Sequence, residues 1–472
     1  MRLTATEVAD ATGGEIVAGV ADAVAGSFTI DSRTTEPGAC FVALVAERDG
    51  HDFVGDAFGR GATVALVGRA VDLPEGREPR ALIRVADPLA GLGALGQLAR
   101  ERLADATVVG ITGSAGKTAT KDLVAAAVRR TRRLTASPVS FNNEAGVPLT
   151  LLGAEGDTEV VVAEMGARFA GNIADLCAIA RPSVGVITNI GLAHAGLLGG
   201  RAGVATVKGE LLEALPPDGL AILDAGDEYT SDLARRTAAR VVRVGLGAGA
   251  TPHPNSTDVR ATDVVLDEQL RPSFHLMTPG GAVGVRLNVR GEHQVLNATM
   301  AAAVALEVGV PLDEIAAGLA EAESAPWRME LTQTPGGVAI LNDAYNASPT
   351  STVAALRALA RLPVTGRRMA VLGEMRELGA EADAAHADVG RVAVECGVDL
   401  LVVVGAAARP VGSGARAAAH GSVEVVDVAD AAAALDAIAP RAEPGDAVLI
   451  KASRAVGLER VAEALADEGA FA

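Results

Sequence analysis

Aromatic residues make up only 2% of this chain of 472 residues, and it contains only three cysteines. Cys40, Cys177 and Cys396 lie far apart and lack the close spacing of a cysteine metal site. They predict buried, reduced thiols rather than a disulfide framework. Charged residues interrupt the Ala/Val-rich runs before these reach the length of a membrane span, and the N-terminus lacks a signal-peptide core. We therefore expect a cytoplasmic protein without membrane insertion.

The chain also has fewer basic than acidic residues. The chain has 41 Lys and Arg residues against 59 Asp and Glu residues, which gives a net charge of −18. General nucleic-acid binders are usually basic, so this class is disfavoured. A small anionic ligand can still bind where local cations and backbone N–H groups line a pocket. Hydrophobic residues, at 49%, argue against disorder. We expect a globular monomer with small-molecule ligands and no nucleic-acid partner.

The chain length predicts about three domains at roughly 150 residues each. The apolar runs place them at residues 1–98, 99–325 and 326–472. Short apolar runs and turn signals alternate in the first domain. The second contains runs that are apolar throughout, as in strands buried on both faces of a parallel sheet: "TVVGIT", "EVVVAEMG", "VGVITNI" and "GLAILDA". The third repeats strand–helix alternation and predicts a doubly wound, Rossmann-like unit. The fold class is therefore α/β with three domains.

The stretch "GITGSAGKTATKD" indicates a phosphate-binding loop between a strand and a helix. Glycines allow the backbone N–H groups to point inward, and the helix N-terminus adds partial positive charge. Lys117 would reach the β- and γ-phosphates, and Thr118 would offer its hydroxyl to Mg²⁺. Ile111 stands where an ordinary phosphate loop has its first glycine, which disfavours a kinase or a switch GTPase. The alternative is a glycine-rich turn without a ligand. The predicted loop residues are Thr112, Gly113, Ser114, Ala115, Gly116, Lys117 and Thr118.

Three further polar residues follow predicted strands or begin a predicted helix. Glu164 ends one strand, His194 follows another, and Lys208 lies near a helix start. Taken singly, they are consistent with a solvated carboxylate, a capped histidine and a surface lysine. Together, downstream of a phosphate loop, they indicate one shared site.

In these stretches the chain resembles the Mur ligases, the ATP-dependent amide-forming enzymes of peptidoglycan synthesis. The family's phosphate loop is T-G-x-x-G-K-[ST], which residues 112–118 fit without the outer glycine. The resemblance runs from residue 31 to residue 454 and is carried by "DSRTTEPGACFVAL", "DGHDF", "FNNEAGVPLTLL", "EMGA", "TNIGLAH", "KGELLEAL", "GEHQVLNATMAAAVAL", "PWRMEL", "NDAYNASPTS" and "VLIKASR".

Two stretches, "DAYNASP" and "FNNEAGVP", are most similar to one member of that family. That member adds D-alanyl-D-alanine to UDP-N-acetylmuramoyl-tripeptide. Two residues depart from its pattern: Ser348 replaces an asparagine and Ala452 replaces a glycine. Ser348 stays small and polar. Ala452 narrows the allowed backbone angles, which puts the site around Lys451 in doubt.

The resemblance implies a mechanism in which ATP phosphorylates a carboxylate and an amine then displaces the phosphate. It implies that Lys117 holds the β- and γ-phosphates, that Thr118 and Glu164 bind one Mg²⁺, and that His194 binds a second. Lys208 matches a lysine that is carbamylated in related ligases. A carbamate would attract Mg²⁺ as an anionic oxygen ligand, whereas an ammonium would repel it.

The resemblance also assigns residues to the nucleotide and the substrates. It implies that Asn297 recognises adenine, Arg328 approaches the γ-phosphate and Asp343 contacts the ribose. ATP would then lie between two domains whose closure excludes water. The matching residues on the UDP-sugar-peptide side are Ser32, Arg33, Asn142 and Asn143. Those at the last-domain substrate edge are Tyr345, Asn346, Lys451, Ser453 and Arg454.

Three alternatives remain at this point. One is a sibling ligase that adds another residue, or a folylpolyglutamate-synthetase-like enzyme; "YNASP" argues against the sibling ligases, and residues 31–63 argue against the folate-type enzyme. Another is a non-catalytic, ligase-like binding protein, which would not need to retain Lys117, Glu164, His194 and Lys208. The third is a switch GTPase, but the chain has no N-K-x-D-like guanine-reading stretch. The third residue of the peptide substrate is left open.

Overall fold

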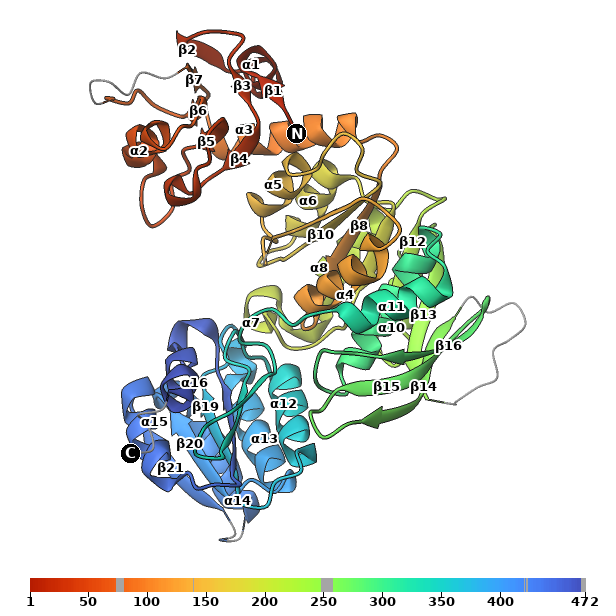
Figure 1. The fold of residues 1–472 in the computed structure, drawn as a ribbon, viewed down its shortest axis with the longest axis vertical. Helices are drawn as coiled ribbons and strands as arrows, with labels where there is room; N and C mark the ends of the chain where they lie inside the picture. Colours follow the sequence, from red (N-terminus) through yellow and green to blue (C-terminus); the bar gives the residue numbers. More distant parts are fainter. Residues whose placement is uncertain (74–79, 139, 248–257, 420, 422, 468–472) are drawn as a thin grey trace.

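The computed structural model describes residues 1–73, 80–138, 140–247, 258–419, 421 and 423–467. Three larger sheets, each with its own helices, follow one another along the chain (Figure 1). In the part that is described, no helix is both long enough and apolar enough to cross a bilayer. The predicted α/β class is confirmed.

The N-terminal sheet has the order β2-β7-β6-β5-β4, beside a two-stranded pair of β1 and β3. Strands β4 to β7 run parallel, and β2 pairs antiparallel with β7. The central strands β5 and β6 are buried throughout because Ala, Cys, Phe, Val and Leu fill both of their faces. The elements are β1 (Leu3–Thr4), α1 (Ala5–Thr12), β2 (Glu15–Gly19), β3 (Val24–Ala25), β4 (Ser27–Thr29), β5 (Ala39–Val42), α2 (Val54–Gly59), β6 (Val64–Val67) and β7 (Ala81–Arg84).

The central sheet has the order β16-β15-β14-β13-β12-β11-β8-β10-β9. The four strands predicted from apolar runs are confirmed as β8, β10, β11 and β12. The antiparallel extension formed by β14, β15 and β16 was not predicted, because buried and exposed residues alternate there. The strands are β8 (Thr107–Thr112), β9 (Leu134–Ala136), β10 (Val160–Glu164), β11 (Val184–Ile187), β12 (Leu220–Asp224), β13 (Arg240–Leu246), β14 (Val259–Leu266), β15 (Pro272–Thr278) and β16 (Gly281–Arg286).

Helices cover both faces of this sheet. Side chains of α4, α10 and α11 share one core with Val109 and Ile111 of β8, whereas α5, α6 and α8 share the other with Val108. This alternation follows from the two-residue period of a strand. The helices are α4 (Lys117–Arg129), α5 (Gly146–Leu152), α6 (Asn172–Ala180), α7 (Ala195–Leu198), α8 (Gly200–Glu213), α9 (Thr230–Ala234), α10 (Gln294–Glu307) and α11 (Leu312–Glu321).

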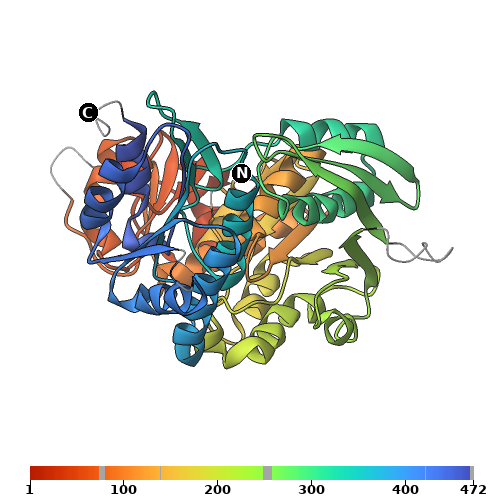
Figure 2. The same cartoon turned by 90° about the horizontal axis from the view of Figure 1, so that it is seen from below.

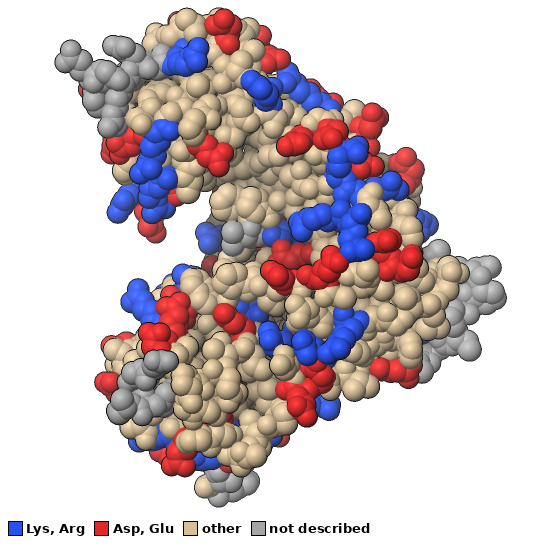
Figure 3. All heavy atoms as spheres, viewed as in Figure 1, with Lys and Arg blue, Asp and Glu red and all other residues tan. Residues whose placement is uncertain are grey.

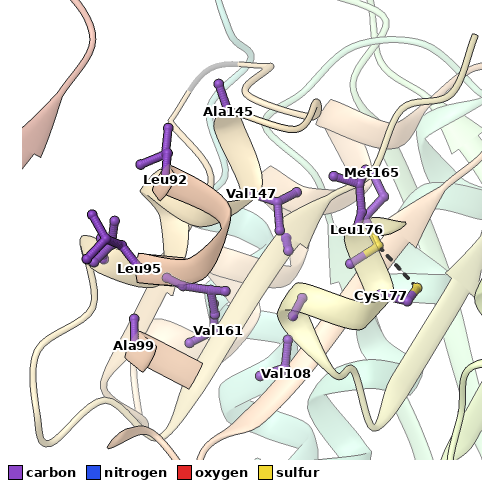
Figure 4. Close-up of a cluster of buried hydrophobic side chains, with 14 of the residues drawn as sticks. Leu92, Leu95, Ala99, Val108, Ala145, Val147, Val161, Met165, Leu176 and Cys177 are labelled. Atoms are coloured by element: carbon purple, nitrogen blue, oxygen red, sulfur yellow. Dashed lines mark hydrogen bonds between the residues drawn. The ribbon is translucent and has the colours of Figure 1, made fainter. Parts of the chain in front are cut away.

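Helix α3 (Pro88–Arg102) connects the first two units. Asp87 caps it by accepting a hydrogen bond from the backbone N–H of Leu89 at 2.8 Å. Its apolar side chains, among them Leu92 and Leu95, pack toward α5 and β10 of the central unit (Figure 4). Residue 98, the predicted end of the first domain, lies within this helix, and the domain limits stay predictions.

The C-terminal sheet has the order β17-β18-β22-β19-β20-β21 and is parallel except for β17. Helices α12, α13 and α14 cover one face, and α15 and α16 cover the other. Figure 2 shows this unit, in blue, beside the yellow-to-green central unit. The elements are β17 (Glu330–Gln333), β18 (Ala339–Asn342), α12 (Pro349–Arg361), β19 (Arg368–Gly373), α13 (Ala382–Glu395), β20 (Leu400–Val404), α14 (Arg409–Ala419), β21 (Glu424–Val428), α15 (Ala431–Ile438), β22 (Ala447–Lys451) and α16 (Glu459–Ala466).

The central and C-terminal units share apolar contacts. Leu270, in the turn between β14 and β15, is fully buried in the core formed by α12, α13 and α14, and Leu192 and Leu266 pack against the same core. Loops that follow the central strands therefore meet the C-terminal unit, and most of the predicted site residues lie on this side of the sheet.

Candidate functional site

The predicted phosphate loop joins β8 to α4. Gly116 precedes the helix with a left-handed φ of 84°, which a glycine adopts without strain. A Cβ atom at Gly116 would lie 2.8 Å from Oδ1 of Asn297, so the loop also needs glycine for space. Lys117 begins the helix and donates a hydrogen bond from Nζ to the carbonyl of Gly113 at 2.7 Å. The lysine thus lies along its own loop.

Thr118, Glu164 and Asn142 form a chain of contacts beside this loop. The Thr118 hydroxyl donates to Oε2 of Glu164 at 2.8 Å, and the Asn142 amide donates to Oε1 of the same carboxylate, also at 2.8 Å. Glu164 ends β10, the strand next to β8, and it is 1% exposed. The two carboxylate oxygens are therefore fixed at the carboxyl edge of the sheet.

Two lysines of the predicted site have lowered pKa values. Lys208, on α8, is 1% exposed, and its pKa is lowered well below the ordinary value by burial and by the positive charge of Lys117. Burial also lowers the pKa of Lys117; Glu164 opposes this effect and Arg328 adds to it. Both ammonium groups therefore release protons more readily than free lysines.

His194 precedes α7 with a left-handed φ of 63°. Its Nδ1 pairs with the carboxylate of Glu377, which belongs to the C-terminal unit. Burial lowers the pKa of His194, Glu377 opposes the shift, and Lys117 and Lys208 add to it. His194 therefore shares one electrostatic environment with both lysines.

Arg328 lies between two residues with left-handed backbones, Trp327 at φ 58° and Met329 at φ 52°. Its guanidinium donates to the Thr118 hydroxyl at 3.2 Å and lies 4.0 Å from the ring centroid of Tyr345. The Tyr345 hydroxyl in turn hydrogen-bonds to the Ser140 hydroxyl of the central unit. Non-glycine residues rarely adopt such angles, which indicates a turn held in place by its surroundings.

Asp343 and Lys451 form a second cluster in the C-terminal unit. Lys451 Nζ lies 2.5 Å from Oδ2 of Asp343 and donates to the carbonyl of Asn346 at 2.9 Å. The other Asp343 oxygen accepts from the backbone N–H of Met329 at 3.1 Å. The neighbouring Ala452 keeps a negative φ, so replacing glycine there imposes no left-handed strain.

The remaining predicted residues make local contacts. Asn297 pairs with Gln294 at 2.9 Å. The Asn143 amide oxygen accepts a hydrogen bond from the backbone N–H of Gly146, the first residue of α5, at 2.9 Å. Arg33 forms an ion pair with Asp31, the Ser453 hydroxyl accepts from the backbone N–H of Arg376, and the Arg454 guanidinium lies over the ring of Trp327. Ser32 is buried in a short 3₁₀ helix. Ser32 and Arg33 lie in the N-terminal unit, and the structure records no bond from either one to the central cluster.

Sequence reasoning missed two polar residues at this site, Glu377 and Asn189. Glu377 stands in "GEMRELG", four residues after the end of β19, and Asn189 stands in "TNIGLAH", two residues after the end of β11. A polar residue that follows a buried parallel strand was the available signal for both.

The oxygens of Thr118 and Glu164 fit a Mg²⁺ ion, because this hard cation prefers oxygen and takes its other ligands from phosphates and water. Within the described ranges, no cluster of three or more His, Cys, Asp or Glu side chains suited to a metal occurs. A nucleotide-borne Mg²⁺ does not require such a cluster. Lys208 as an ammonium does not fit a cation site.

Comparison with known proteins identifies the family that has this site. Residues 111–305 match the Mur ligase middle domain, and residues 327–454 match the Mur ligase, glutamate ligase domain. A protein of Mycobacterium leprae (strain TN), named UDP-N-acetylmuramoyl-tripeptide--D-alanyl-D-alanine ligase, is 40% identical over 519 residues, and 99% of each chain is covered.

Solved structures agree with this match. Crystal structure I of MurF from Acinetobacter baumannii has a TM-score of 0.85 at 32% identity and covers 98% of this chain and 99% of that one. The MurF ligase from Thermotoga maritima, in complex with ADP, has a TM-score of 0.76 at 28% identity and covers 93% and 96%. Because sequence and fold match over nearly the whole length, this chain belongs to the Mur ligase family.

Proposed function

We propose that this chain joins D-alanyl-D-alanine to UDP-N-acetylmuramoyl-tripeptide through an amide bond, with conversion of ATP to ADP and phosphate. The observation that carries the proposal is the full-length identity of 40% to the Mycobacterium leprae ligase of that name. The contacts among Lys117, Thr118, Glu164 and Arg328 support it, because they supply cations and a carboxylate beside a phosphate loop.

The chemistry has two steps. The terminal carboxylate of the tripeptide attacks the γ-phosphorus of ATP, which gives an acyl phosphate and ADP. The neutral amine of D-alanyl-D-alanine then attacks the acyl carbon, phosphate leaves with the bonding electrons, and the released phosphate takes up the proton that the nitrogen loses. A carboxylate alone is a poor electrophile, and phosphorylation provides the leaving group. The protein contributes positioning and stabilisation of charge.

Lys117 and Arg328 are the cations we assign to the phosphates. Lys117 would turn from the Gly113 carbonyl to the β- and γ-phosphates, and Arg328 already donates to Thr118 beside the loop. A Mg²⁺ ion at Thr118 and Glu164 would neutralise phosphate charge. We assign Asn297 to the adenine and Asp343 to the ribose, which sets ATP between the two units.

Lys208 and His194 are assigned to the acyl side. We propose that the Lys208 amine carries a carbamate in the active enzyme, because its lowered pKa leaves the neutral amine that reacts with CO₂. The carbamate would then join His194 in holding a second Mg²⁺ ion. The carbamate places a negative charge beside Lys117, where a protonated Lys208 would place a second positive one.

The substrates are assigned to the hollow between the N-terminal and C-terminal units, whose upper rim carries Lys and Arg side chains together with Asp and Glu side chains in Figure 3. The Lys and Arg side chains of this rim suit an anionic UDP-sugar. We assign Ser32, Arg33, Asn142 and Asn143 to the UDP-sugar-peptide. The acceptor dipeptide is assigned to the C-terminal edge, at Tyr345, Asn346, Lys451, Ser453 and Arg454. We propose that the protein acts as a cytoplasmic monomer.

The test is a reconstituted reaction. Purified protein is incubated with ATP, Mg²⁺, UDP-N-acetylmuramoyl-tripeptide and D-alanyl-D-alanine, and the product is identified by mass spectrometry. We expect the pentapeptide product, and far faster phosphate release with D-alanyl-D-alanine than with D-glutamate or meso-diaminopimelate. A preference for either amino acid would contradict the assigned acceptor but not the ligase chemistry. Tripeptides ending in lysine or diaminopimelate would identify the third residue.

A further inference from the structure

The phosphate loop is held from outside by the segment that follows β11. Strand β11 lies parallel to β8, with Ile187 beside Thr112. The segments that follow these two strands therefore leave the sheet side by side. Asn189 comes two residues after the end of β11. Its Oδ1 accepts a hydrogen bond from the backbone N–H of Ala115 at 3.1 Å, and its Nδ2 donates to the carbonyl of Ala115 at 2.9 Å. One side-chain amide thus bonds both polar backbone groups of a single loop residue.

Neighbouring contacts extend this attachment. The backbone N–H of Ser114 donates to the carbonyl of Asn189 at 3.0 Å, and the Thr188 hydroxyl donates to the carbonyl of Ala115 at 2.6 Å. The Ser114 hydroxyl accepts from the backbone N–H of Gly191 at 2.8 Å. A Cβ atom at Gly113 would lie 1.8 Å from the Thr188 hydroxyl, so the two segments are packed without spare room.

These hydrogen bonds determine which backbone N–H groups of the loop remain free to bind an anion. The N–H groups of Ser114 and Ala115 are engaged by Asn189 and point toward the β11 segment. The first N–H groups of α4, beginning at Lys117, have no intrahelical acceptor, as at any helix start. An anion at this loop can therefore bind the N-terminus of α4 and Lys117. Asn189 fixes the turn of the loop and thereby the direction in which both of them point.

We infer that Asn189 is a positioning residue of the nucleotide site: its amide locks the Ala115 peptide, so that the start of α4 meets the ATP phosphates in a preformed geometry. This inference rests on the proposed ATP-dependent function. An ordinary phosphate loop starts from a further glycine, where this chain has Ile111. In this loop, which lacks that glycine, the segment after β11 supplies the restraint. Preorganisation raises affinity because less conformational freedom is lost on binding.

The experiment compares ADP binding by isothermal titration calorimetry for the wild type, Asn189→Ala and Asn189→Asp. Asn189→Ala leaves both Ala115 groups without their side-chain partner. Asn189→Asp keeps the acceptor for the N–H but sets an oxygen against the Ala115 carbonyl. We expect ADP to bind about tenfold or more weakly to each variant, since unmade bonds of this kind cost on that scale. Adenosine, which lacks phosphates, should bind the variants and the wild type equally.

The matched control is Asn172→Ala. The Asn172 amide oxygen also accepts two backbone hydrogen bonds, from Arg168 and Phe169, but it does so in the loop after β10. This variant should keep wild-type ADP affinity. A purely structural role for Asn189 predicts a lower thermal midpoint with unchanged ADP affinity in the folded fraction, and that result would overturn the inference. Equal losses of ADP and adenosine would also overturn it. A wild type that binds no ADP would instead contradict the proposed function.

Discussion

The imidazole of His194 faces the carboxylate of Glu377 across the boundary between the central and C-terminal units. Both residues have left-handed backbones, with φ values of 63° and 64°. The backbone N–H of Gly196 donates to the Glu377 carbonyl at 3.1 Å, and Gly196 lies against Gly379. A proposed catalytic histidine is therefore also part of the contact that docks the C-terminal unit, which links docking to the completeness of the site.

We expect Glu377→Ala to loosen this docking. The two side chains are partly exposed and the pKa of His194 is lowered by burial, so their contact contributes only about 1 kcal/mol or less. Hydrogen exchange of peptides covering residues 194–200 and 375–380 should rise by up to about fivefold. Glu374→Ala is the control, because that side chain pairs only with Arg376 in the part of the chain that is described. Unchanged exchange in Glu377→Ala would show that the backbone contacts alone hold the interface.

Gly196→Ala should disrupt the contact between the central and C-terminal units more strongly than Glu377→Ala does. A Cβ atom there would lie 2.4 Å from the backbone nitrogen of Gly379, and a backbone atom cannot move aside as a flexible side chain can. We expect small-angle X-ray scattering to show a larger radius of gyration and turnover to fall at least tenfold. Gly284→Ala is the control, since open space surrounds that position. A variant as compact and as active as the wild type would contradict this account of the interface.

Lys117→Ala should reduce turnover by about 10²-fold or more while the protein stays folded, because Lys117 is assigned to charge that develops on the transferred phosphoryl group. Steady-state phosphate release measures the effect, and circular dichroism checks the fold. Arg129→Ala, which removes an exposed cation from the far end of the same helix, should leave turnover unchanged. Turnover near the wild-type value for Lys117→Ala would remove the lysine from the proposed mechanism.

The cysteines should differ in reactivity. Burial raises the pKa of Cys40 and of Cys177 to about 12, and it raises the pKa of the less buried Cys396 as well. The prediction of buried thiols thus holds for two of the three residues. Because the thiolate is the nucleophile, the folded protein at pH 7.5 should be labelled slowly by a maleimide, at Cys396 first, and faster as the pH rises. Mass spectrometry of the labelled peptides would contradict this if Cys40 or Cys177 reacted first.

The sequence predicted the parts of the site that are encoded locally. Strand, glycine turn and helix follow one another within residues 107–129, so the phosphate loop is visible as a pattern. Glu164 was visible because a carboxylate ends a run that is otherwise apolar. Strand β8 was visible because its run is apolar throughout, as expected for a strand whose two faces are both buried.

Other features depend on neighbours that are distant in sequence. Asn189 meets Ala115 only because β11 lies beside β8, and Glu377 meets His194 only because two units dock. The backbone strain expected at Ala452 is absent, and the roles predicted for the residues around Lys451 stay predictions. The Ala452 backbone keeps a negative φ, and its Cβ packs beside Gly373 of the neighbouring strand. Spacing along the chain carries no information about such pairings.

Lys208 gives the sharpest test of the acyl side of the site. Burial and the charge of Lys117 hold its pKa well below the ordinary value, so a larger fraction of the amine is neutral near pH 7. Neutral amine reacts with CO₂, and lowering the pH should therefore favour the ammonium and reduce carbamate formation. We expect activity to fall when bicarbonate and CO₂ are removed from the buffer and to return when they are restored. Carbon-13 NMR of enzyme equilibrated with labelled bicarbonate should show a carbamate signal.

Variants of Lys208 separate the carbamate from a plain cation. Lys208→Ala should lose most of the activity, and acetate should restore part of it, because a small carboxylate can occupy the vacated space and offer oxygens to Mg²⁺. Lys208→Arg should remain inactive, since its guanidinium keeps a positive charge and is not carbamylated in the same way. A phosphate-contacting ammonium predicts the opposite order, with a tolerably active Lys208→Arg and no effect of acetate on Lys208→Ala. Wild type with acetate is the control for a general salt effect. An active Lys208→Arg together with absence of the labelled carbamate signal would assign Lys208 to phosphate contact instead.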